Sequence, residues 1–132
     1  MAQLLQFAWN QSSVVVAPVT TAETVILVSN PVEVPTGAFM ALIQASLSMT
    51  LGTGTTGVTL RVRRGSTATG TQVEGSGNIT SGVTAGSNWL EQLQAVDQPL
   101  LGDQVQYCIT YQAAGATANA ASLSESIAVW IF

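Results

Sequence analysis

The longest regular pattern of hydrophobic and polar positions in this chain lies between residues 39 and 64. Apolar residues occupy every odd position over 39–51, and most even positions are polar from Gln44 onward. A period of two places successive side chains on opposite faces of a strand, so this pattern predicts a long β-strand with one apolar face. The glycine- and threonine-rich run 52–57 interrupts the alternation, because glycine reaches the positive φ angles of turns. The alternation resumes over 58–62, which predicts a central β-hairpin.

Other stretches predict further strands around this hairpin. Residues 14–16 and 25–28 are runs rich in β-branched or continuous apolar residues, and residues 104–112 alternate regularly. The last stretch, 122–132, has apolar residues on both faces near its end, so we expect another sheet or another subunit to cover it.

Two segments are harder to assign. Trp89 to Val96 fits both a helical and an alternating spacing, and its predicted neighbours favour a strand. Residues 65–88 are rich in glycine, serine and threonine, which predicts long loops with short strands at 72–74 and 78–80. The acidic residues Asp97 and Asp103 lie in turn sequences, where aspartate normally caps backbone amides.

Seven to nine strands with glycine-rich turns and no helix predict an all-β fold, an antiparallel jelly-roll-like β-sandwich. An immunoglobulin-like sandwich is the alternative, although the chain lacks the paired cysteines of many such domains. The length of 132 residues suits one domain. We expect an N-terminal arm at 1–12 and a single β-sandwich domain at 13–132.

The composition is unusual for a domain of this size. Only 8% of the residues are charged against about 25% in ordinary domains, the net charge is −4, and lysine and histidine are missing. Hydroxyl and amide side chains must therefore cover the surface. Such a surface costs little to desolvate, and it favours extensive contact with other protein.

The same composition argues against an enzyme. Without histidine or lysine, the common activated nucleophiles and Schiff-base mechanisms cannot be built. The seven acidic residues are scattered and show no calcium-loop spacing, so we expect no metal and no cofactor. Trp9, Trp89 and Trp130 could form a carbohydrate platform, but packing is the commoner role of tryptophan in a small β-protein.

Nucleic-acid and membrane partners are also not expected. Arg61, Arg63 and Arg64 are the only cations, too few to follow a phosphate backbone. No stretch approaches the roughly 20 apolar residues of a membrane helix, and the N-terminus lacks the basic region of a signal peptide. Cys108 is the only cysteine, which excludes an intrachain disulfide.

Residues in the C-terminal third carry a resemblance to a group of known proteins. The segment from Asp97 through Gly102-Asp103-Gln104-Val105 to Ile109 resembles the Gly-Asp-x-Val sequence before a late strand of TNF/C1q-like jelly rolls. The run 107–132, with its small-residue turn at 115–118, looks like small structural proteins of tailed bacteriophages, namely capsid decoration (cement) proteins and fibre tips. The strand at 58–65 is similar to the same group. This resemblance implies a trimer and a location in the virion.

Together these observations predict a non-enzymatic structural virion protein. We expect a homotrimeric capsid decoration protein, made in the host cytoplasm, that binds the major capsid protein and stabilises the viral shell. A trimeric fibre tip that recognises a host surface glycan is the alternative, and a secreted adhesion module is a third. We expect subunit contacts from Ile127, Val129, Trp130 and Phe132, and contacts with the capsid or a neighbour from Leu4, Leu5, Phe7 and Trp9.

Overall fold

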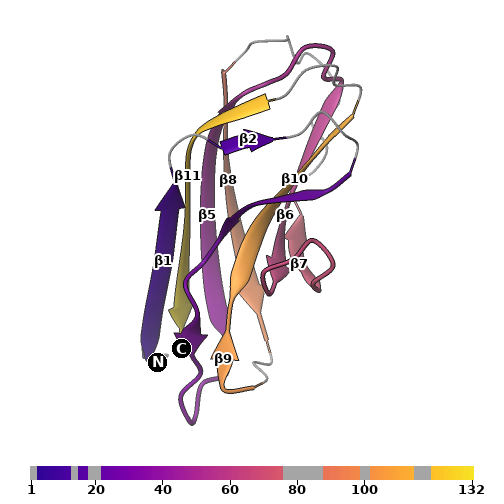
Figure 1. Ribbon diagram of the computed structural model, residues 1–132. Helices are drawn as coiled ribbons and strands as arrows, with labels where there is room; N and C mark the ends of the chain where they lie inside the picture. Colours follow the sequence, from indigo (N-terminus) through magenta and orange to yellow (C-terminus); the bar gives the residue numbers. More distant parts are fainter. Residues whose placement is uncertain (1–2, 13–14, 18–21, 76–87, 99–101, 115–119) are drawn as a thin grey trace.

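The protein folds into two facing β-sheets in the computed structural model (Figure 1). The structure describes residues 3–12, 15–17, 22–75, 88–98, 102–114 and 120–132. Within these residues there are eleven strands and no helix. All strand pairings between them are antiparallel, which confirms the predicted all-β class.

The first sheet, called sheet A here, has the order β1-β11-β5-β8, and β2 also pairs with β11. Its strands are β1 (Gln6–Ser12), β2 (Val15–Ala17), β5 (Ala41–Thr50), β8 (Asn88–Asp97) and β11 (Ala120–Ile131). Sheet B has the order β3-β10-β6-β7. Its strands are β3 (Thr24–Val28), β6 (Gly57–Arg64), β7 (Gln72–Gly75) and β10 (Tyr107–Ala114). A small third pair joins β4 (Val32–Glu33) to β9 (Gln104–Val105).

This order of strands is that of a jelly roll. When the short strands β2, β4 and β9 are set aside, the first remaining strand, β1, lies beside the last, β11. The second, β3, lies beside the second to last, β10. These neighbours arrange the strands in two nested Greek keys, as in other jelly rolls. The predicted jelly-roll sandwich is confirmed.

The core lies between the two sheets, and it follows the predicted alternation. On β5, the odd-numbered residues from Ala41 to Leu47 point inward and are at most 3% exposed. The inward row Ala8–Val129–Ile43–Ala95 crosses all four main strands of sheet A. Tyr107, Ile109 and Tyr111 of β10 fill the middle from sheet B.

The central hairpin joins the two sheets rather than lying within one. β5 belongs to sheet A and β6 to sheet B, so the turn between them crosses the sandwich at one end. Gly54 has a φ of 78°, in the left-handed region that favours glycine. The Thr55 hydroxyl donates to the Gly52 carbonyl at 2.7 Å and closes the turn. The two strands are therefore as predicted, but they do not pair with each other.

The structure assigns strands to most of the segments that were ambiguous in the sequence. Residues 88–97 form β8, so the strand preferred for Trp89 to Val96 is confirmed, and the short strand predicted at 72–74 is β7. The strand predicted at 78–80 lies outside the described residues. The strand predicted over 104–112 is divided into β9 and β10, and β4 was not predicted as a strand, because a two-residue segment leaves no alternating pattern.

Residues 6–12 of the expected N-terminal arm form β1 at the edge of sheet A. All seven pair with β11, from Gln6 opposite Ile131 to Ser12 opposite Glu125. The Leu5 amide continues the ladder by donating to the Ile131 carbonyl at 2.7 Å. The first and last strands of the described chain therefore lie side by side. Only the outward side chains of residues 6–12 are available for contact with a neighbouring subunit.

Candidate functional site

A buried ionic cluster joins the two sheets at the end of β8. Asp97 is 4% exposed, and its Oδ2 accepts hydrogen bonds from Arg64 Nε at 2.8 Å and from the Tyr107 hydroxyl at 2.7 Å. Arg64 Nη2 also donates to Asp97 Oδ1. Burial alone would raise the pKa of Asp97, but the hydrogen bonds from Arg64 and Tyr107 outweigh it and the pKa is lowered. Asp97 therefore links sheet A to sheet B, whereas the sequence suggested a turn cap.

A second ionic cluster ties Glu23 to the outer side of sheet B. Arg63 Nε and Nη2 donate to its two carboxylate oxygens at 2.9 and 2.7 Å, and Arg61 Nη1 lies 3.3 Å from Oε1. The Thr110 hydroxyl donates to the same oxygen. Since Arg61 and Arg63 are engaged with Glu23, and Arg64 with Asp97, the guanidinium groups are held in structural pairs.

These clusters predict a loss of stability in acid. Burial would raise the pKa of Glu23, but hydrogen bonds from Arg63 and Thr110 and the nearby arginine charges lower it below the ordinary value of a glutamate. The pKa of Asp97 is likewise lowered below the ordinary value of an aspartate. The folded protein thus holds these protons less tightly than the unfolded chain, so the stabilisation is complete above about pH 4.5. It is lost as the pH falls through the lowered pKa values.

Urea unfolding at a series of pH values between neutral and about pH 3 checks this expectation. Asp97→Asn removes one titrating group, so the pH dependence of the variant should be shallower than that of the wild type. A free energy of unfolding that stays constant through the acid range would contradict the assignment.

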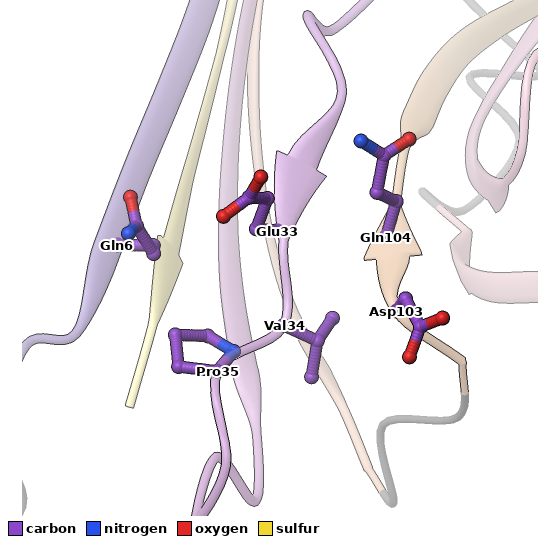
Figure 2. Close-up of a pocket in the computed structure, with 6 residues that line it drawn as sticks. All are labelled: Gln6, Glu33, Val34, Pro35, Asp103 and Gln104. Atoms are coloured by element: carbon purple, nitrogen blue, oxygen red, sulfur yellow. The ribbon is translucent and has the colours of Figure 1, made fainter.

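A hollow of about 620 Å³ lies beside the β4–β9 pair (Figure 2). Its lining residues are Gln6, Glu33, Val34, Pro35, Asp103 and Gln104. In Figure 2 the Glu33 carboxylate points toward Gln6 of β1, whereas the Asp103 carboxylate points to the other side of the pair. Within the described residues, no group of three or more histidine, cysteine or acidic side chains could hold a metal ion. The hollow thus offers no converging set of ligands or catalytic groups.

The most distinctive surface of the molecule is the outer face of sheet A. Phe7, Trp130, Leu42 and Val96 lie opposite one another on β1, β11, β5 and β8, and form one row across the sheet. Leu42, Val96 and Trp130 each lie between two buried residues, and Phe7 precedes the buried Ala8, so all four point away from the core. The rings of Phe7 and Trp130 are in contact, with centroids 5.4 Å apart.

Further apolar side chains extend this row into a patch. Trp9 lies two residues beyond Phe7 on β1 and is 51% exposed, while Phe7 itself is 47% exposed. Phe132 and Met40 exchange backbone hydrogen bonds at the other side of the row, and both are partly exposed. We call this surface the apolar patch. It comprises Leu5, Phe7, Trp9, Met40, Leu42, Val96, Trp130 and Phe132.

The patch unites residues that the sequence placed in two separate contacts. Leu5, Phe7 and Trp9 share the odd-numbered side of the first strand, and β11 brings Trp130 and Phe132 next to them. Leu4 is 48% exposed just before β1. Ile127 and Val129 are both 0% exposed within the chain's own core, so of the four predicted subunit contacts only Trp130 and Phe132 are accessible to a partner.

Sequence reasoning missed the contributions of β5 and β8 to this surface. Met40 and Leu42 interrupt the polar series at the even positions of 39–51, and that interruption was the available signal. Val96, 53% exposed, could not be assigned to the patch without the register of β8 against β5. Phe39 and Leu90 are also exposed large apolar residues, at 50% and 64%.

An apolar surface of this kind is suited to binding protein. Contiguous exposed apolar patches on soluble domains commonly mark interaction sites, and aromatic residues are enriched at interface cores. The row carries no ionised side chain and no converging polar groups. No helix among the described residues is long and apolar enough to cross a membrane.

Comparison with known proteins finds likeness at the level of the fold. No protein-family model matches the sequence, and no curated protein matches it. A chain in the structure of infectious bursal disease virus, Gx strain, aligns with a TM-score of 0.58 and 13% identity, and one from the Gt strain with 0.52 and 12%. Each alignment covers 95% of this chain but only 32% of the virus chain, so this protein spans about a third of their length.

A third alignment concerns disulfide-linked pili, the Bacillus endospore appendages. It covers 96% of this chain and 89% of that chain at 19% identity, with a TM-score of 0.48. At that score it carries no argument. The virus alignments agree with the jelly-roll fold, while the resemblance to phage proteins and to TNF/C1q-like domains remains a prediction.

Proposed function

We propose that this protein is a non-enzymatic structural protein of a virus particle, a homotrimer that decorates the capsid and stabilises it by binding the major capsid protein. The observation that carries the proposal is the apolar patch on the outer face of sheet A. A protein that exposes Phe7 and Trp9 at 47% and 51% leaves a large apolar area in water unless another protein covers it.

The surface chemistry supports the same role. Only 8% of the residues are charged, and the described arginines are engaged with Glu23 and Asp97 inside the chain. Such a surface contributes little long-range electrostatic attraction, so specificity must come from shape and apolar contact. The jelly-roll fold, which many viral shell proteins also use, is compatible with this role.

Within this proposal the patch has two parts. Trp130 and Phe132, together with Phe7, pack against the equivalent residues of the other subunits of the trimer. Leu4, Leu5 and Trp9 lie at the rim of the patch on β1 and just before it, and they contact the shell. The Asn30 side chain donates to the Trp9 carbonyl at 2.7 Å, which holds this part of β1 in place.

A charge in the middle of the patch tests the trimer. Trp130→Glu should break the wild-type trimer, because a carboxylate buried at an interface without a partner is strongly unfavourable. Ser126→Glu is the matched control, since it places the same charge on the same face of β11 outside the patch. Light-scattering mass after gel filtration measures both, and circular dichroism checks that each variant is folded.

Co-sedimentation with empty shells of a candidate major capsid protein tests the decoration role. The wild type and Ser126→Glu should pellet with the shells, and a Leu4→Ser, Leu5→Ser, Trp9→Ser variant should stay in the supernatant as a folded trimer. A Trp130→Glu chain that keeps the wild-type mass, or a triple variant that still binds the shell, would contradict the proposal.

A further inference from the structure

Within the described part of the chain, β8 is a long edge strand of sheet A. Among the described residues, its only partner strand is β5, to which all ten of its residues are paired. The opposite edge, β1, is partly covered, because Asn30 donates to the Trp9 carbonyl and Asn10 donates to the Val28 carbonyl at 2.8 Å. The edge strands of sheet B, β3 and β7, have only five and four residues.

This edge lacks most of the features that normally prevent pairing with another chain. Soluble proteins protect long edges with lysines, prolines, bulges, short strands or inward-pointing charged residues. β8 contains no lysine, arginine or proline, and its pairing with β5 is regular over the whole strand. β8 has two acidic residues, Glu91 and Asp97, and Asp97 is engaged with Arg64 and Tyr107. The edge can therefore accept an added strand.

The side chains of β8 indicate which strand would be added at this edge. Its outward residues are Leu90, Gln92, Gln94 and Val96, with Leu90 and Val96 64% and 53% exposed. This order is apolar, amide, amide, apolar, and it reads the same in both directions. An antiparallel copy centred on Leu93 would place Leu90 opposite Val96 of the second copy, and Gln92 opposite its Gln94. Both apolar ends would then meet apolar residues, and both amides would meet amides.

We infer that β8 is a self-pairing edge, at which a second copy of this chain adds its own β8 antiparallel about a two-fold axis through Leu93. The pairing is isologous, as in most two-fold contacts of identical subunits. Main-chain hydrogen bonds supply much of the affinity, as they do when a strand is added to other sheets. The two copies of sheet A become one continuous sheet, in which Val96 at the end of each apolar row meets Leu90 of the other copy.

The inference does not rest on the proposed function. The trimer contact is assigned to Trp130, Phe132 and Phe7 on β11 and β1, whereas β8 lies at the other edge of the sheet. Both contacts can form in the same assembly. Two trimers joined through their β8 edges contain six chains, and blocking either contact leaves the other intact.

Charge substitutions on β8 separate the two contacts. Gln92→Lys and Gln94→Lys together place like charges opposite one another in the paired strands. Both residues are exposed and lie outside the apolar patch, so the fold and the trimer contact should persist. Gln72→Lys, on the exposed edge strand β7 of sheet B, is the matched control. Light scattering at increasing concentration should show the mass of the wild type and of the control at twice that of the β8 variant. An equal mass for all three would overturn the inference.

Disulfide trapping tests the register. A mixture of the single variants Gln92→Cys and Gln94→Cys should form cross-linked dimers faster than either variant alone, because directly opposed residues on paired strands are closer than diagonal ones. Native Cys108 is buried and does not interfere. Equal yields in the mixture and in the separate samples, or no dimer, would refute the two-fold pairing at Leu93.

Discussion

Asp97→Ala should lower the free energy of unfolding by about 3 kcal/mol. The substitution leaves the Tyr107 hydroxyl, in a residue 0% exposed, without its acceptor, and it leaves Arg64 without its carboxylate. Breaking a buried ion pair typically costs about 3–5 kcal/mol. We expect the lower end of that range, because the Arg64 side chain is 36% exposed and water can reach it.

Two milder variants serve as controls for the Asp97 cluster. Tyr107→Phe removes one hydrogen bond, so its cost should be about 1 kcal/mol. Asp97→Asn keeps the shape of the side chain and should fall between the other two. Urea unfolding at neutral pH measures all three. If Asp97→Ala cost no more than Tyr107→Phe, the cluster would not be the link between the sheets that we describe.

Ile127→Ala should cost about 2–5 kcal/mol, because it leaves a cavity in the core. Ile127 is 0% exposed and lies opposite Ala45 of β5 and Asn10 of β1. The neighbouring residue Ser126 points to the outer face, so Ser126→Ala should change stability by less than about 0.5 kcal/mol. The contrast between two adjacent residues tests which face of β11 is inside.

Thermal or urea unfolding of these two variants measures the loss of stability at each position. Comparable losses at positions 126 and 127 would mean that β11 does not alternate as described. A tolerant Ile127 would also reopen its assignment to a contact between subunits, which its burial in the core now argues against.

Much of the fold could be predicted because the inner faces of the strands are encoded locally. The apolar odd positions of β5 and the alternation of β10 and β11 follow directly from a period of two. The ambiguous segment 89–96 was also assigned correctly, since its predicted neighbours were strands. The pairing of β5 was not predictable in the same way. The sequence suggests a simple hairpin with β6, but in the jelly roll β5 pairs with β11 and β8.

The candidate site depends on information that no single stretch contains. Phe7, Leu42, Val96 and Trp130 form one row only because four strands align in a particular register. Two of the four, Phe7 and Trp130, were identified because large aromatic residues near the chain ends stood out. Asp97 was interpreted as a turn cap because its partner Arg64 lies 33 residues away in the sequence, and only the fold brings the two together.

The outer face of sheet A is the proposed contact between subunits. The solution mass of the wild-type protein, measured by light scattering over a wide concentration range, tests this with one quantity. We predict a mass of three chains of 13.6 kDa, or of six where the β8 edges also pair. A mass of one chain at every concentration would contradict the account, because Phe7, Trp9 and Trp130 would then remain exposed to water.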